Sequence, residues 1–545
     1  MIFLCYFPTE VIIRLLSFLP PKELASCARL SKRFLAIIQA SSILTYALEA
    51  SKAGLDETYH LNRLDTYDIT PAELLADLRR RESGWSTFTW NKHLEIPIGK
   101  TYIQMEICGH VFAGGYPRTP NDYGVTAIDV YDFQNDKNNG FVTTLSLDIC
   151  CLGSNFDAGQ DLLILGEMCT LHDPFCKLHI RSLSTGLEYT HAEVKQSILS
   201  LPIPHNTRTG YHSAIFIFGD NLLFLQANGR DWCKLTQIKW KTAQTLTVYS
   251  GFGTFNPLMI SETEILLAGC DAEGIPVVKY YVTNMDEANV TGSCKDKDDT
   301  SRSLNLVTFN LPFKNLADAD PRTWDMGWTF AKAAFTPKPF SPFVKSSTII
   351  YPPYSHLVAV RIESFYNDLS DDNERINTFD IFIHLETLRK YRKTFSTQKE
   401  VSWEDWGPSA TRVFRNKYPA HWERRALRGY RVLAPDLPQF RMVNGDGKMD
   451  CVILDFNQKA WTSSTPGIVW GLSEVVTQDE NKTKITSCLP YRKIYRKVSM
   501  ASWQNFNIFG IRTNNPFAML GDDIVCFDVD TSSGPLTKAL HVFKF

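Results

Sequence analysis

Two cysteines and two histidines in one short segment have the side chains that bind zinc. They are Cys169, His172, Cys176 and His179, and thiolate sulfur and imidazole nitrogen are the usual ligands of structural Zn²⁺. However, His179 lies in a run of alternating apolar and polar residues typical of a β-strand, whereas the other three precede it in a turn. Side chains from a strand and from the turn before it are poorly placed to bind the same ion, so we expect no metal site here.

Two glycine-containing segments partly match nucleotide or calcium sites but lack the residues that those sites need. Residues 251–256 (GFGTFN) lack the third glycine and the following helix of a dinucleotide fingerprint. Residues 444–450 (NGDGKMD) lack the distal glutamate of a calcium loop. The chain also contains no GxSxG, HExxH, phosphate-binding or kinase motif. We therefore expect strand connections at both segments, in a protein that is not an enzyme and has no catalytic residues and no cofactor.

One segment is strongly basic. Residues 411–431 contain seven arginines and lysines but one glutamate, interleaved with aromatic residues. Because arginine binds phosphate and carboxylate groups through two parallel hydrogen bonds, such a cluster can bind an acidic or phosphorylated protein segment. The candidate substrate-binding residues are Arg424, Arg425, Arg428 and Arg431. The alternative is a solvated loop or short helix without a binding role.

The first ninety residues are predicted to be helical. Apolar residues recur at three- and four-residue spacing from residue 9 to residue 19, which is typical of an amphipathic helix. Further helices are predicted over residues 21–27, 30–38 and 42–53, the last of these ending at Gly54. Another helix is predicted from a capping box at residues 70–73 to about Arg81. Trp85, Phe88 and Trp90 follow this helix as an apolar anchor.

Three motifs within residues 7–34 resemble an F-box in register from end to end. They are residues 7–11 (FPTEV), 15–24 (LLSFLPPKEL) and 29–34 (RLSKRF). The F-box pattern has leucine-proline, a hydrophobic helix, a proline-lysine-acid-leucine turn and a valine-serine-lysine-arginine-aromatic helix. Phe7, Leu30 and Phe34 stand where leucine, valine and tryptophan are usual, and all three keep apolar volume. The alternative is an ordinary helical cap on the following domain.

This resemblance implies a partner and a docking face. An F-box binds a Skp-type adaptor and, through it, a cullin-RING (SCF-type) ubiquitin ligase, so the chain would be the substrate-recognition subunit in ubiquitin-dependent degradation. The continuation to residue 90 is similar to fungal F-box proteins of the mushroom type. The docking residues that the resemblance implies are Phe7, Pro8, Leu15, Leu16, Leu19, Leu24, Leu30 and Phe34. Some of these eight must instead hold the helices together.

The rest of the chain repeats a β pattern in which a turn cluster, about four apolar residues and an alternating strand follow one another. The apolar runs lie at residues 162–165, 222–225, 265–268, 357–360, 451–454 and 524–527. A strand buried on both faces beside one buried on one face is what a β-propeller blade needs. We predict a propeller of seven or eight blades, with a pair of β-sandwiches as the alternative.

The predicted fold class is therefore α+β and multidomain. A three-helix F-box covers residues 1–48, a helical linker covers residues 49–90, and a large all-β domain that binds protein substrates covers residues 91–545. The alternative function is a propeller scaffold for protein–protein interaction outside a ubiquitin ligase.

Composition limits the partners and the compartment. The net charge of -2 argues against binding nucleic acid or an anionic membrane through the overall field. The 13 cysteines include no CxxC pair, which favours a reducing compartment. No segment approaches 18 uninterrupted apolar residues, so we expect no membrane span and a cytoplasmic and/or nuclear location.

Overall fold

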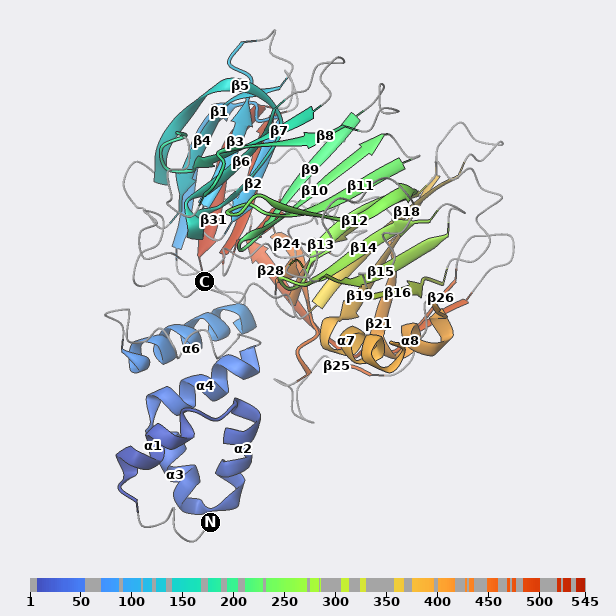
Figure 1. Ribbon diagram of the computed structural model, residues 1–545. Helices are drawn as coiled ribbons and strands as arrows, with labels where there is room; N and C mark the ends of the chain where they lie inside the picture. Colours follow the sequence, from blue (N-terminus) through green and yellow to red (C-terminus); the bar gives the residue numbers. More distant parts are fainter. Residues whose placement is uncertain are drawn as a thin grey trace.

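A computed structural model shows an N-terminal group of helices followed by a large all-β region with several antiparallel sheets (Figure 1). It describes residues 7–53, 70–87, 92–108, 111–119, 124–133, 140–167, 175–187, 194–203, 211–228, 232–271, 275–283, 285, 305–312, 324–329, 357–366, 375–396, 400–416, 427–428, 431–435, 448–458, 468–470, 473–476, 484–499, 517–530 (without 521–522) and 536–544.

Four short helices form the N-terminal module: α1 (Thr9–Leu16), α2 (Pro21–Leu30), α3 (Lys32–Ala40) and α4 (Ser42–Ala53). Pro21 begins α2 at a position where its missing N–H needs no partner. The Ser31 hydroxyl accepts a hydrogen bond from the Phe34 N–H at 3.1 Å and caps α3. The α2 helix is three residues longer than predicted, because the chain becomes extended only at Ser31. The boundary predicted after residue 48 falls inside α4.

The fifth described helix, α6 (Pro71–Thr87), begins with the predicted capping box. The Glu73 carboxylate accepts a hydrogen bond from the Thr70 N–H at 2.8 Å, and the Thr70 hydroxyl accepts one from the Glu73 N–H at 3.3 Å. The helix continues six residues beyond the predicted end near Arg81, because Trp85 is only 2% exposed and its burial holds the last turn. Gly54, Phe88 and Trp90 lie outside the described residues.

The membrane prediction concerns these helices. Taken singly, no helix in the described part of the chain is long and apolar enough to cross a membrane. The pair α3 and α4, bent by 90° at its break, meets the length and hydropathy criteria together. Its apolar residues Phe34, Ile37, Ile38 and Leu44 lie in the core of the helical module.

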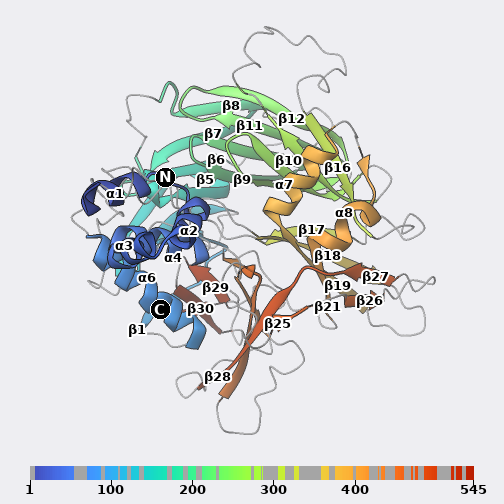
Figure 2. The ribbon, with the colours of Figure 1, turned by 90° about the horizontal axis from the view of Figure 1, so that it is seen from below.

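The β region is organised as successive antiparallel sheets (Figures 1 and 2). The first along the chain contains β2 (Gln104–Cys108), β3 (Val111–Tyr116), β4 (Val125–Asp132), β5 (Phe141–Asp157), β6 (Leu162–Glu167), β7 (Phe175–Ser182) and β8 (Ile198–Pro202). The second contains β9 (Tyr211–Phe218), β10 (Asn221–Asn228), β11 (Trp232–Lys239) and β12 (Gln244–Phe252).

The third sheet contains β13 (Thr254–Met259), β14 (Glu264–Cys270), β15 (Pro276–Val282), β16 (Asn305–Asn310) and β20 (Glu400–Val401). The fourth contains β17 (Trp324–Thr329), β18 (Leu357–Tyr366), β19 (Arg375–His384) and β21 (Thr411–Asn416). The fifth contains β22 (Leu427–Arg428), β23 (Arg431–Pro435), β24 (Lys448–Asp455), β28 (Tyr491–Ser499) and β25 (Ile468–Val469), and β26 (Ser473–Val476) pairs with β27 (Lys484–Ser487) in a separate hairpin.

The last sheet joins the two ends of the β region. Strand β1 (Lys92–Lys100) pairs with β31 (Leu536–Lys544), which pairs with β30 (Asp523–Asp530) and then β29 (Phe517–Leu520). Lys92 lies opposite Lys544 and Ile96 opposite Leu540. Residues 536–544 are therefore tied into a sheet on both sides, by β1 and by β30.

The six predicted apolar runs lie in strands β6, β10, β14, β18, β24 and β30, each flanked by a strand on both sides. The partner strands also pair as predicted. For example, Leu222 lies opposite Ile238, and Leu266 lies opposite Tyr280. Tyr366 pairs with Arg375 at one end of the β18–β19 pair, and residues 367–374 lie outside the described part of the chain.

Alternating contacts explain why these runs are apolar throughout. In β10, Leu222 and Phe224 pack against β6 and β7, whereas Leu223 and Leu225 pack against β14 and β15. Successive side chains of a strand point to opposite faces, so a strand with a sheet on each side buries every residue. The layers between sheets are therefore continuous hydrophobic cores.

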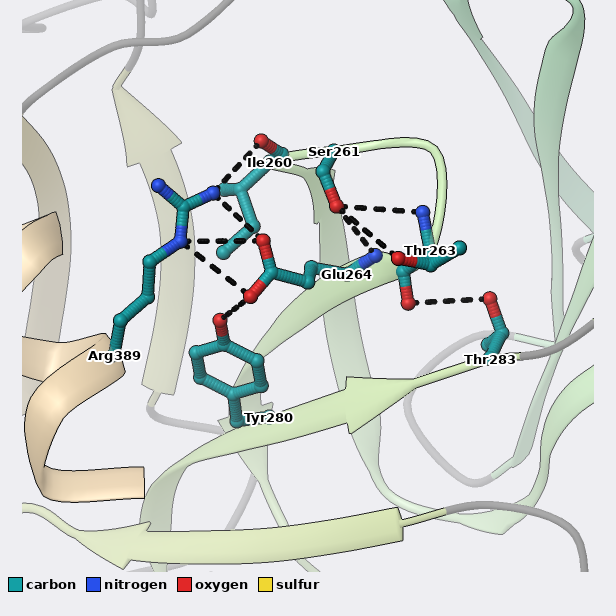
Figure 3. Close-up of polar contacts among 7 residues, drawn as sticks. All are labelled: Ile260, Ser261, Thr263, Glu264, Tyr280, Thr283 and Arg389. Atoms are coloured by element: carbon teal, nitrogen blue, oxygen red, sulfur yellow. Dashed lines mark hydrogen bonds and ion pairs between the residues drawn. The ribbon is translucent and has the colours of Figure 1, made fainter. Parts of the chain in front are cut away.

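Two helices are inserted between β19 and β21: α7 (Leu385–Thr394) and α8 (Trp403–Ala410). The α7 helix is attached to the third sheet through a polar cluster (Figure 3). The Glu264 carboxylate at the start of β14 accepts a hydrogen bond from the Arg389 guanidinium at 2.6 Å and another from the Tyr280 hydroxyl. Burial alone raises the pKa of Glu264, but Arg389 and Tyr280 outweigh it and hold that pKa below its ordinary value of 4.5.

The Glu264 contacts predict a pH effect on stability. Because the pKa of Glu264 is lower in the folded chain than in the unfolded chain, its ionised form stabilises the fold above the unfolded pKa, and this contribution is lost as the pH falls through the folded pKa. We expect Glu264→Gln to lower the free energy of unfolding by about 2 kcal/mol at pH 7 and to reduce the loss of stability below about pH 4.5. Urea unfolding at a series of pH values measures both.

The matched control is Glu386→Gln, because Glu386 is exposed in the first turn of the same α7 helix. We expect the control to keep the parent pH dependence. An unchanged acid dependence in Glu264→Gln would contradict the proposed role of the carboxylate.

Candidate functional site

The α1 helix has apolar residues on two sides, and only one side is used in the core of the module. Ile12 and Leu16 are buried against α2, α3 and α4. Val11 and Leu15 are four residues apart, which places them along one face of α1, and Phe18 follows in the turn after the helix. Leu15 is 45% exposed and Phe18 is 76% exposed. This second face is therefore available to a partner.

Other large apolar residues of the module are also exposed. They are Phe7 before α1, Leu30 at the end of α2 and Leu35 in α3. The Arg33 guanidinium of α3 donates a hydrogen bond to the Phe7 carbonyl oxygen at 3.1 Å, which holds the start of the chain beside α3. We call Phe7, Val11, Leu15, Phe18, Leu30 and Leu35 the helical apolar face.

The eight docking residues implied by the F-box resemblance divide into three groups. Phe7, Pro8, Leu15 and Leu30 are exposed, Leu19 is partly buried, and Leu16, Leu24 and Phe34 are buried in the core of the module. The expectation that some of them hold the helices together therefore matches their positions, while their part in docking stays a prediction. The eight residues do not include Val11, Phe18 and Leu35, which are also exposed, although the spacing of Val11 and Leu15 in the sequence already indicated a second apolar side of α1.

The helical module is fixed to the β region through the end of α6. The Arg431 guanidinium of β23 donates to both carboxylate oxygens of Glu82 in α6, at 3.0 and 2.5 Å, and lies over the Trp85 ring at 6.0 Å. Asn457, after β24, donates through its side-chain amide to the Lys52 carbonyl oxygen at the end of α4. Figure 1 shows α6 between the other helices and the sheets. We call Glu82, Trp85, Arg431 and Asp455 the inter-domain cluster.

Charge complementarity holds this cluster. The Arg431 Nε lies 3.9 Å from the Asp455 carboxylate. Burial alone lowers the pKa of Arg431, but the carboxylates of Glu82 and Asp455 outweigh burial and raise it. Burial raises the pKa of Asp455, and Arg431 offsets part of that increase. Arg431 is therefore held as a cation between two acidic residues from different parts of the chain.

The structure places the basic segment partly inside the protein. Arg412 is 1% exposed and donates to the Leu489 carbonyl oxygen at 2.7 Å, so it does not belong to a surface cluster. Arg431 is engaged with Glu82. The described part of the segment forms strands β21, β22 and β23, rather than a loop or helix. Arg424 and Arg425 lie outside the described residues, and Arg428 is described by its backbone in β22, so substrate binding by these residues stays a prediction.

The other candidate motifs do not form sites among the described residues. Cys176 is buried in β7, and His179 contacts the Glu167 carboxylate at 2.8 Å, while Cys169 and His172 lie outside the described part. In the described part, no three metal-binding side chains are grouped closely enough to hold an ion. Gly253 connects β12 to β13 at φ +117, as predicted for a strand connection, and a Cβ there would lie 2.4 Å from the Cys270 carbonyl oxygen.

A comparison with protein families identifies the helical module. Residues 4–44 match the F-box-like family model. The match contains α1, α2 and α3 and extends into the start of α4, and so includes the whole helical apolar face. The chain therefore has an F-box-like domain at its N-terminus. A search of curated proteins finds no match.

Solved structures resemble the chain only weakly. Oligopeptidase B from Trypanosoma brucei with bound antipain is 11% identical at a TM-score of 0.28, over 63% of this chain and 37% of that protein. Drosophila Plexin A in complex with Semaphorin 1b is 7% identical at a TM-score of 0.33, over 84% and 87%. Chaetomium thermophilum Raptor is 11% identical at a TM-score of 0.24, over 64% and 38%. We draw no argument from these similarities.

The inter-domain cluster predicts energetic coupling between the helices and the sheets. In a double-mutant cycle of Glu82→Gln and Arg431→Met, we expect a coupling energy of about 1–3 kcal/mol, because this ion pair is largely removed from water. Urea unfolding of the four proteins of the cycle measures it. The control cycle uses Glu49→Gln and Arg79→Met, a more exposed pair between α4 and α6, where water screening reduces the coupling. Equal coupling in the two cycles would contradict the prediction.

Proposed function

We propose that the chain is the substrate-recognition subunit of an SCF-type ubiquitin ligase. The observation that supports this most directly is that the F-box-like match coincides with helices that leave a set of apolar residues exposed. Isolated exposed apolar residues are common, but several large ones within one small module favour a protein-binding surface. In this proposal the helical apolar face binds a Skp-type adaptor and, through it, the cullin and RING subunits.

The β region is proposed to bind the protein substrate. We propose that its sheets are the blades of a β-propeller, with β5 shared between two adjacent blades and β1 completing the blade of β29, β30 and β31. Successive meanders of about four strands, and the pairing of β1 with β31, support this arrangement. A propeller offers broad faces and many loops for holding a folded or extended substrate. The substrate class proposed is an acidic or phosphorylated protein segment.

The remaining properties follow from this role. The chain is proposed to be a non-catalytic adaptor without cofactor, which positions substrate for ubiquitin transfer by other subunits. The proposed location is cytoplasmic and/or nuclear, and nucleic acid and membrane are not among the proposed partners. The F-box motifs and the continuation to residue 90 favour membership of the fungal, mushroom-type group of F-box proteins.

Adaptor binding is tested by a charge on the helical apolar face. We expect Leu15→Asp to weaken binding of a purified Skp-type adaptor at least tenfold, because it places an ionised carboxylate in a dehydrated interface. Since Leu15 is 45% exposed, the helical module should keep its helix content. Co-purification and titration calorimetry measure binding, and circular dichroism measures folding.

The matched control is Leu187→Asp, because Leu187 is 70% exposed in the β region, after β7. We expect this variant to bind adaptor like the parent. Adaptor binding by a folded Leu15→Asp protein with parent affinity would refute the proposed docking face.

A further inference from the structure

The outer strands of the third and fourth sheets are covered by other parts of the chain. An edge strand exposes backbone N–H and C=O groups that can pair with another chain. Strand β16 is covered because β20 pairs with it through Thr308 and Phe309. Strand β21 is covered because the Leu489 N–H donates to the Thr411 carbonyl oxygen at 2.9 Å, and the Val413 N–H donates to the Ser487 hydroxyl at 3.1 Å.

Two other edge strands have sequences that discourage pairing. Strand β1 contains Pro97 and the charged residues Lys92, Glu95 and Lys100. Strand β8 has only five residues and ends at Pro202. Proline removes a backbone donor, and charged side chains oppose the approach of another strand. These edges are therefore protected either by a covering segment or by their composition.

Strand β12 has neither kind of protection. It has nine residues, Gln244–Phe252 (QTLTVYSGF), with no charged residue and no proline. In the part of the chain that the structure describes, it pairs with β11 and with no other strand. Thr245, Ser250 and Phe252 are exposed, Phe252 by 67%. The edge of β12 is therefore open to an additional strand in the described part of the chain, and from Tyr249 to Phe252, beyond the register shift at Leu235/Thr236, its pairing with β11 is continuous.

Two lysines lie beside the second half of β12, one near each of two successive residues. Lys234 of β11 is paired with Ser250 of β12. The Lys279 ammonium of β15 lies over the Tyr249 ring at 4.9 Å and over the Phe255 ring at 4.7 Å. Tyr249 and Ser250 are consecutive, so their side chains point to opposite faces of the sheet. Positive charge is therefore present on both faces of this edge.

These lysines are not neutralised within the described part of the chain. Neither ammonium forms an ion pair with a described carboxylate, and burial lowers the pKa of both. The negative charges of Asp271 and Glu400 raise the pKa of Lys279 without an ion-pair contact, and they offset part of the decrease that burial causes. An incoming carboxylate would therefore gain attraction without first displacing a described carboxylate from either lysine.

We propose that the edge of β12 binds an extended, acidic segment of the protein substrate by adding it as a further strand. This inference rests on the proposed function, because it names the substrate class that the β region takes. The added strand lies about 4.8 Å from β12, and main-chain hydrogen bonds provide affinity. Two consecutive acidic residues opposite Tyr249 and Ser250 point to opposite faces, one toward Lys279 and the other toward Lys234. The two lysines then favour an acidic segment over a neutral or basic one.

The test uses labelled ten-residue peptides and the full-length protein co-purified with its adaptor. The first peptide is a threonine-valine strand with two consecutive central glutamates, and its analogue has two lysines there. We expect the glutamate peptide to bind at least tenfold more tightly in fluorescence anisotropy. Two further peptides have N-methyl groups on alternate residues, either odd or even. Only one of these sets faces β12, so we expect one N-methylated peptide to lose binding and the other to keep it.

Protein variants locate the site. We expect Ser250→Glu and Lys279→Met each to weaken binding of the glutamate peptide at least fivefold. The controls are Ser200→Glu, on the exposed side of edge strand β8, and Lys390→Met, on the exposed side of α7, and both should bind like the parent. The proposal is overturned by equal binding of glutamate and lysine peptides, by equal effects of the two N-methyl patterns, or by no binding.

The same samples separate this proposal from the proposed function. If the full-length protein co-purifies with the adaptor but binds no peptide, the β12 site alone is refuted. If the full-length protein binds the glutamate peptide but does not co-purify with the adaptor, the β12 site is supported and the ligase role is refuted. Light scattering tests a third possibility. If the parent is a dimer that Ser250→Glu dissociates, the occupant of the edge is a second copy of the chain, and the acidic-substrate proposal is wrong.

Discussion

Each sheet of this protein can bury both of its faces only by packing against neighbouring sheets, and this constraint governs the rest of the β region. The alternating contacts of β10 show the principle, since odd and even residues of one strand belong to different cores. Losing one sheet would therefore expose apolar surface on two others. The same constraint accounts for the insertions, because α7, α8 and the β26–β27 hairpin pack around the third and fourth sheets.

The F-box-like helices differ from the sheets because they leave large apolar side chains exposed. They are too few to bury all of their apolar residues among themselves, so one side of α1 stays exposed while the other forms the core. Their attachment to the sheets is polar and charged, through Arg431, Glu82 and Asn457. Because directional contacts define orientation more closely than apolar contact does, this attachment determines how the F-box-like helices are oriented relative to the β region.

Sequence reasoning was accurate for several patterns that are local in the sequence, although it misplaced the ends of α2 and α6. The capping box at Thr70 and Glu73, the apolar runs and their hairpin partners all depend on residues that are close in sequence, and the structure shows them as predicted. It failed for interactions between distant residues. Arg431 belonged to a basic segment in the sequence, and only folding revealed Glu82 as its partner. Likewise Arg412 was counted as a surface charge, although it is buried with main-chain carbonyl groups as acceptors.

The pairing of β1 with β31 has a consequence for biosynthesis. A ribosome makes the F-box-like helices and β1 first, yet the partner of β1 is available only after residues 536–544 have emerged. Until those residues have been made, β1 lacks the strand with which it pairs in the folded protein. Synthesis of residues 536–544 therefore completes the sheet that contains β1, and until then the backbone groups of β1 that pair with β31 lack their strand partner.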